Sequence, residues 1–119
     1  MSQFECCNLA DLFRPSNSKS KFVDVYKEAD DGGYRMCGRF KFWMENNSSC
    51  FRYISKGGNI VPLLVTIWEN RKIAFSNQSG GVLITLSMSK SGYVTGNYDL
   101  VDEGKVVLES KIFIKLPVK

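Results

Sequence analysis

Apolar and polar residues alternate along most of the chain from residue 21 onward, in short runs separated by clusters of glycine, asparagine and serine. A period of two is typical of strands with one buried face. About eight strands fit, at residues 22–27, 34–45, 50–55, 60–68, 72–75, 82–88, 93–101 and 105–116. Because no long helical pattern separates them, we expect an all-β, single-domain antiparallel β-sandwich, with a small closed β-barrel as the alternative.

The alternation assigns each strand an inward and an outward face. In residues 34–45 the predicted inward side chains are Tyr34, Met36, Gly38, Phe40, Phe42 and Met44, and the outward ones are Arg35, Cys37, Arg39, Lys41 and Trp43. In residues 105–116 the predicted inward side chains are Val106, Leu108, Ile112, Ile114 and Leu116, and the outward ones are Lys105, Glu109, Lys111, Phe113 and Lys115. Both strands therefore combine an apolar face with a cationic one.

Residues 60–68 differ because they are apolar on both faces. Such a run is typical of a strand that is covered on both sides. Pro62 has no backbone N–H, so we expect it near the start of this strand or at an unpaired position.

The first 20 residues form a separate segment in this interpretation, with the β domain at residues 21–119. Asn8 is a candidate N-cap for a short helix over residues 8–13, which presents Leu9, Leu12 and Phe13 and ends before Pro15. We expect this N-terminal arm either to dock on the core of its own domain or to reach another subunit.

Composition narrows the function classes. The chain has 119 residues and no histidine, which removes the usual general base and the commonest zinc ligand. A formal charge of +4 is mild, and many ordinary domains share it. No apolar targeting run is visible near the start, so a cytoplasmic location is expected and a nuclear one is not excluded. We predict a protein that is not an enzyme and holds no cofactor.

The four cysteines are predicted to form neither a metal site nor a bridge between Cys37 and Cys50. If a turn at residues 46–49 places Cys50 opposite Glu45, Cys37 lies roughly 27 Å down the strand, beyond the reach of a disulfide. Cys37 is then a free thiol on a surface strand. Acidic loop residues (Asp30, Asp31, Asp102, Glu103) could bind calcium, but carboxylates beside glycine also make ordinary turns.

The candidate binding residues lie on the two outward faces and are Arg35, Arg39, Lys41, Trp43, Lys111, Phe113 and Lys115. Exposed aromatic rings interleaved with cations can stack bases and neutralise phosphates, which favours single-stranded nucleic acid, RNA in particular. The same pattern also arises when lysine and arginine stems cover aromatic rings at the edge of a core.

The function that we expect first is protein–protein interaction through a strand edge or loops, because an unpaired edge accepts a strand from a partner. This hypothesis requires one apolar, uncharged edge. Nucleic-acid binding is the alternative, and no membrane partner is expected. A homo-oligomer formed through a strand edge or the N-terminal arm is also consistent with the pattern.

Overall fold

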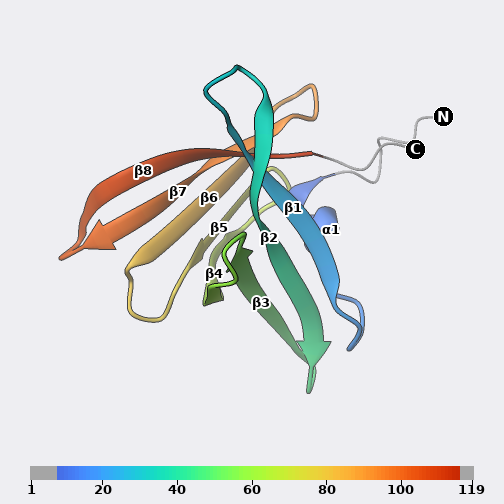
Figure 1. Cartoon of the computed structure of the whole chain (residues 1–119). Coiled ribbons are helices and arrows are strands. Elements are labelled where there is room, and N and C mark those ends of the chain that lie inside the picture. The colour runs from blue at the N-terminus through green and yellow to red at the C-terminus, as the bar shows by residue number, and fades with distance from the viewer. Residues whose placement is uncertain (1–7, 116–119) are drawn as a thin grey trace.

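The computed structural model describes residues 8–115 as one short helix and eight strands (Figure 1). The elements are α1 (Leu9–Leu12), β1 (Lys21–Glu28), β2 (Tyr34–Glu45), β3 (Ser48–Ser55), β4 (Ile60–Trp68), β5 (Lys72–Ser76), β6 (Val82–Met88), β7 (Val94–Asp102) and β8 (Lys105–Ile114). The strands start and end within about two residues of the positions predicted from the alternation. The all-β prediction is confirmed.

The strands pair in chain order, each antiparallel to the next, and β8 returns to β1 to close a barrel. The alternative architecture is therefore the observed one, and the two-layer sandwich is not. Closure depends on a short ladder, Val25–Ile114 and Tyr26–Phe113, between β1 and β8. The β3–β4 ladder is also short and joins residues 51–54 to residues 60–63. Elsewhere neighbouring strands pair over most of their length.

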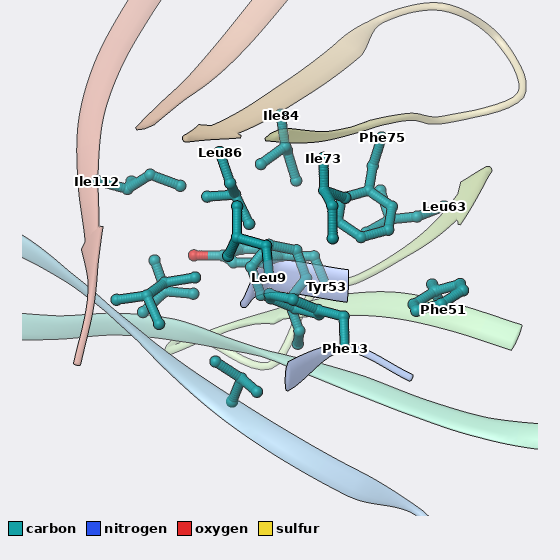
Figure 2. Packing of buried hydrophobic residues seen from close by; sticks show 14 of the residues in the cluster. Leu9, Phe13, Phe51, Tyr53, Leu63, Ile73, Phe75, Ile84, Leu86 and Ile112 are labelled. Atoms are coloured by element: carbon teal, nitrogen blue, oxygen red, sulfur yellow. The ribbon is translucent and has the colours of Figure 1, made fainter. Parts of the chain in front are cut away.

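Aromatic side chains fill the inside of the barrel (Figure 2). The ring of Phe13 lies 5.1 Å from that of Phe40, 5.6 Å from that of Phe42 and 5.9 Å from that of Phe75, measured between centroids. All four rings are at most 1% exposed. An eight-stranded barrel has an interior just wide enough for side chains to fill, and here one ring from the end of the helix and three rings from two strands, β2 and β5, fill it together.

Helix α1 docks on the core of its own domain. The Asn8 side chain accepts a hydrogen bond from the Asp11 backbone N–H at 2.8 Å, which caps the first turn as predicted. The Leu9 N–H donates to the Asn70 carbonyl at 2.8 Å and ties the helix to the β4–β5 turn. Leu9 and Phe13 are completely buried, so the N-terminal arm contributes its apolar face to the barrel interior.

The β2–β3 connection is tighter than predicted. Asn46 and Asn47 both have left-handed backbone conformations, with φ of 52° and 64°, which is the geometry of a two-residue hairpin turn. Cys50 therefore pairs with Trp43 and not with Glu45. Cys37 still lies six positions further along β2, and both cysteines are free thiols in the structure.

A bulge in β2 corrects the predicted facing of its first residues. Val25 pairs with Gly38 but Tyr26 pairs with Met36, so Cys37 is an extra residue in the ladder. A bulge reverses the alternation beyond it. Tyr34 consequently points outward and is 62% exposed, whereas Cys37 packs against the core cluster instead of lying on the surface.

The predicted inward face of the last strand is buried only in its second half. Ile112 and Ile114 are buried, but Val106 and Leu108 are 53% and 54% exposed. Val107 is an extra residue in the β7–β8 ladder, and the hairpin end extends beyond the packed interior (Figure 1). Leu116, the last residue of the predicted face, lies outside the described residues.

The prediction that residues 60–68 are covered on both sides is wrong. Ile60 and Leu64 are 57% and 56% exposed on the outer face of β4. In a single-layer barrel the outer face of a strand has no second sheet to cover it. Pro62 sits near the strand start, as expected, and pairs with Arg52 of β3 where β4 has no β5 partner.

We expect Phe13→Ala to lower the free energy of unfolding by about 3–5 kcal/mol, because the substitution removes the ring at the centre of the packed interior. Urea unfolding followed by far-UV circular dichroism measures the change. Leu12→Ala, in the same helix but only partly buried, is the matched control and should cost clearly less. A cost below about 1 kcal/mol for Phe13→Ala would show that α1 does not support the barrel.

Candidate functional site

The outer face of β1, β2 and β3 carries a basic–aromatic surface made of Phe22, Arg39, Lys41, Trp43 and Arg52. Lys41 is paired with Phe22 on one side and with Arg52 on the other, so these three residues form one row across the strands. Arg39 and Trp43 flank the row on β2. The predicted outward facing of Arg39, Lys41 and Trp43 agrees with this arrangement, because the residues between them, Phe40 and Phe42, are buried.

Cations lie over both aromatic rings of this surface. The Lys41 Nζ lies 5.3 Å and the Arg52 Cζ lies 5.0 Å from the centroid of the Trp43 ring. The Arg39 Cζ lies 5.4 Å from the centroid of the Phe22 ring. A base that stacked on Trp43 would have to displace at least one of these contacts, each worth about 0.5–1 kcal/mol at an exposed site.

Two carboxylates partly neutralise the positive charge of the basic–aromatic surface. The Trp43 Nε1–H donates to Glu45 Oε1 at 3.0 Å, which fixes the orientation of the indole. Arg39 forms an ion pair with Asp24 at 3.3 Å on the neighbouring strand. An exposed pair of this kind adds little stability, so Arg39 can exchange Asp24 for another anion at small cost.

The remaining candidate residues are only partly assembled with this surface. Lys115 and Arg39 line one hollow of about 400 Å³ beside β1. Phe113 packs edge-on against Tyr34, with centroids 5.1 Å apart, so its ring is covered by an aromatic neighbour. Lys111 lies further along β8, opposite Asn97 of β7. Arg35 precedes the β2 bulge, and the reversed alternation places it on the strand face opposite Tyr34.

The barrel wall opens between β3 and β4. Beyond the Phe51–Leu63 pair, residues 48–50 of β3 are paired with β2 alone and residues 64–68 of β4 are paired with β5 alone. Within residues 8–115 no other backbone pairs with these two half-edges. We call this opening the seam. Neither half-edge carries a charged side chain.

An apolar hollow of about 360 Å³ lies in the seam. Its lining comes from both sides of the opening and consists of Ser49, Phe51, Leu63, Leu64, Val65 and Trp68. Phe51 and Leu63 belong to the core, whereas Leu64 is 56% exposed and Trp68 is 37% exposed. The Phe51 and Trp68 rings lie 5.8 Å apart at the base. The hollow therefore connects the barrel interior with an exposed apolar strand.

A thiol and two phenols meet on the inner side of the barrel. The Cys37 Sγ lies 3.6 Å from the Tyr53 Oη, and the Tyr53 and Tyr98 rings lie 5.0 Å apart. A Cβ atom at Gly38 would overlap the Tyr53 hydroxyl, so only glycine admits this ring. Burial raises the pKa of the Tyr53 phenol, and the hydrogen bond and charge of Cys37 and the charge of Tyr98 raise that pKa further. Burial also raises the pKa of Tyr98.

Asp99 of β7 is the one buried charged residue among those described, with 7% of its surface exposed. It is paired with Glu109 of β8 and with Leu83 of β6. Its Oδ1 has no hydrogen-bond partner in the described part of the chain. Burial, and secondarily the charge of Glu109, raise the pKa of the Asp99 carboxyl. The two carboxylates therefore repel each other across the β7–β8 ladder.

The acidic loops make turns. Asp31 accepts a hydrogen bond from the Gly33 N–H at 2.9 Å, and Glu103 has a φ of 52° in the β7–β8 turn. Among residues 8–115 no three carboxylate or thiolate side chains converge in a way that could hold a metal ion. Over the same range no helix is long and apolar enough to cross a membrane.

No family model, no curated protein and no solved structure matches this chain. The candidate surfaces are therefore described from their geometry alone. Sequence reasoning missed Arg52, although it alternates outward between Phe51 and Tyr53. It also missed the seam, because the uncharged residues 60–68 have the pattern of a strand that is buried on both faces, and only the pairing partners show that part of the strand is free.

The buried phenols predict a loss of stability at alkaline pH. Since the folded-state pKa of Tyr53 is raised above the unfolded value of about 10, its contribution is complete below that pH and is lost as the pH rises past it. Urea unfolding at about pH 8 and pH 11 should show a smaller alkaline loss for Tyr53→Phe than for the wild type. Tyr93→Phe removes a phenol that is 73% exposed and should leave the loss unchanged. Equal losses in all three proteins would contradict the assignment.

Proposed function

We propose that this chain is a non-enzymatic protein-binding module that accepts an extended, uncharged segment of a partner protein at the seam. The segment adds to the β4 half-edge at residues 64–68 and places an apolar side chain in the adjoining hollow. The observation that carries the proposal is the coincidence of an unpaired backbone with an exposed apolar lining at one place.

The unpaired edge supplies the attraction. Long, flat, hydrophobic edges are normally blunted by lysine, proline or a covering loop, because they pair readily with other chains. The half-edge at residues 64–68 has no lysine and no proline, and it contains Leu64, Val65 and Trp68 with 56%, 39% and 37% exposure. The hypothesis of binding through a strand edge requires one apolar and uncharged edge, and this half-edge has those properties.

The hollow supplies selectivity for side chains. Its lining is mainly apolar and includes the core ring of Phe51, so an inserted aliphatic or aromatic side chain would be partly shielded from water. Burying one such side chain contributes about 1.5–3 kcal/mol. The bulge at Thr66 leaves part of the β4 backbone outside the β5 ladder and gives the incoming segment further hydrogen-bonding groups.

A cytoplasmic or nuclear location belongs to the same proposal, because the free thiols Cys37 and Cys50 suit a reducing compartment.

Peptides selected against the full chain from a random 12-residue display library test the seam. We expect apolar, alternating peptides whose binding slows amide hydrogen exchange at residues 64–68. Leu64→Lys should weaken that binding at least about tenfold, because it places a charge on the edge. The matched control is Ile60→Lys, with the same exposure on the same strand, where β4 already has β3 as its partner.

Two results would refute the seam as the binding site. One is a set of selected peptides that bind the Leu64→Lys and Ile60→Lys variants equally well. The other is protection that appears on strands other than β3 and β4 when the peptide is added.

Single-stranded RNA binding is the second candidate, favoured by the row of Phe22, Lys41 and Arg52 beside Arg39 and Trp43. If Arg39, Lys41 and Arg52 each neutralise one phosphate, affinity for a labelled oligouridine should fall roughly 20-fold between about 50 and 200 mM salt. Fluorescence anisotropy measures this fall. Arg52→Glu should abolish binding, whereas Lys56→Glu, in the β3–β4 turn, should not. Binding that is absent at low salt would remove this candidate.

A further inference from the structure

The β8 strand has a second free edge, separate from the seam. On the side away from β7, β8 pairs with β1 only at Phe113 and Ile114. Within the described residues no backbone pairs with residues 105–112 on that side. Figure 1 shows β8 crossing β1 near its C-terminal end and then extending away from it. Val106, Val107 and Leu108 are all more than half exposed along this edge.

We propose that the β8 edge is a homodimer interface, in which a second copy of the chain pairs its own β8 antiparallel to the first about a two-fold axis at Ser110. In this register Glu109 of each copy lies opposite Lys111 of the other, and Leu108 lies opposite Ile112. Directly opposite residues in an antiparallel ladder share a face and have Cβ atoms about 4.5–5.5 Å apart. A two-fold axis creates every such contact twice.

The charge order selects this register over its neighbours. An axis at Glu109 would place the two Glu109 carboxylates opposite each other, and an axis at Lys111 would place the two ammonium groups opposite each other. An axis at Leu108 would set Lys105 against Lys111. Like charges directly opposite destabilise a ladder, and over the regular residues 108–112 of the free edge the axis at Ser110 pairs each charge with its opposite. An axis at Val107 would also set Lys105 against Glu109, but it would fall on the bulge. Lys105 and Lys115 face each other in the Ser110 register only outside residues 108–112, beyond the bulge and beyond the pairs with β1.

The same register adds a cation to the row that Asp99 and Glu109 form across β7 and β8. Asp99 is buried, and its Oδ1 has no hydrogen-bond partner among residues 8–115. Its neighbour across the β7–β8 ladder is the carboxylate of Glu109. Lys111 of the second copy would extend the row beyond Glu109, giving Asp99, Glu109 and a lysine in sequence. The lysine offsets the repulsion between the two acids across β7 and β8.

The charges on the β8 edge also oppose pairing with strand edges of other proteins. Lysine on an edge strand ordinarily prevents pairing with other chains. At the β8 edge Glu109 and Lys111 find their complements on an identical edge in the Ser110 register, so the residues that oppose an edge of like charge admit a second copy. The bulge at Val107 ends the regular part of the β8 strand and so limits the ladder to the residues that follow it.

A charge-reversal series tests the interface. Sedimentation equilibrium of the full chain from about 5 to 500 µM should show a monomer–dimer equilibrium, because a short edge ladder gives a weak interface. Glu109→Lys and Lys111→Glu each create two like-charge pairs and should weaken the dimer about 10- to 30-fold. The double variant restores opposite pairs and should recover dimerisation to near the wild-type value. Lys90→Glu, in the β6–β7 turn, is the control of equal charge and should have no effect.

A crosslink tests the position of the axis. Antiparallel partners lie about 4.5–5.5 Å apart between Cα atoms, within the range that a disulfide spans. Oxidised Ser110→Cys should therefore form a covalent dimer in which peptide mapping finds position 110 joined to position 110. Ser91→Cys, in the β6–β7 turn, is the matched control and should not.

Three results would overturn the proposal: a wild-type chain that is monomeric throughout the concentration range, a dimer that the single charge reversals leave intact, or a double variant that stays monomeric. None of these results bears on peptide binding at the seam, which uses other residues. Conversely, Leu64→Lys should leave the dimer unchanged.

Discussion

The aromatic packing inside the barrel also determines where its wall opens. Phe51 occupies the last residue pair between β3 and β4, and its ring lies 5.3 Å from that of Phe75 and 5.8 Å from that of Trp68. Continuing the ladder would draw residues 64–66 against residues 48–50 and bring the two strands together around these rings. Overpacked interiors are destabilised just as cavities are, so the strands separate instead. The ring of Phe13 fills the centre and removes the space into which Phe51 and Phe75 could otherwise retreat. The seam thus lies where the large rings of the barrel interior reach the wall, beside the hollow lined by Phe51 and Trp68.

Local alternation predicted the strands well because it is a property of each strand by itself. It could not choose between a sandwich and a barrel, since both bury one face of every strand with the same period. The choice was made by two residue pairs, Val25–Ile114 and Tyr26–Phe113, which lie nearly 90 positions apart and leave no local signal. Bulges were invisible for a related reason. One extra residue in β2, Cys37, reverses the facing of the residues at the start of the strand. Tyr34 therefore lies on the surface, although the sequence pattern alone places it inside.

The candidate surfaces were predictable to the extent that they lie on one strand. Lys41 and Trp43 were placed correctly from the alternation within β2. Arg52 joined them only through the register of the β2–β3 hairpin, and that register depends on the left-handed conformations of Asn46 and Asn47. A turn two residues longer, as the sequence suggested, would have moved Arg52 out of the row. Features made of pairing partners that are missing, such as the seam and the β8 edge, have no signature in a sequence at all, because they depend on where a neighbouring strand stops.

The two free edges differ in what they can discriminate. An uncharged edge attracts through backbone groups and apolar area, which many extended segments share, so its selectivity rests on the side chain that fits the hollow. An edge with alternating charges gains less from each contact but disfavours the registers and partners that set like charges opposite each other. Placing the charged edge on β8 and the uncharged one on β4 keeps the two from competing, since a β4 half-edge set against β8 would desolvate Glu109 and Lys111 without supplying an opposite charge. The proposed dimer and the proposed peptide site therefore use different edges of the same barrel, and neither blocks the other.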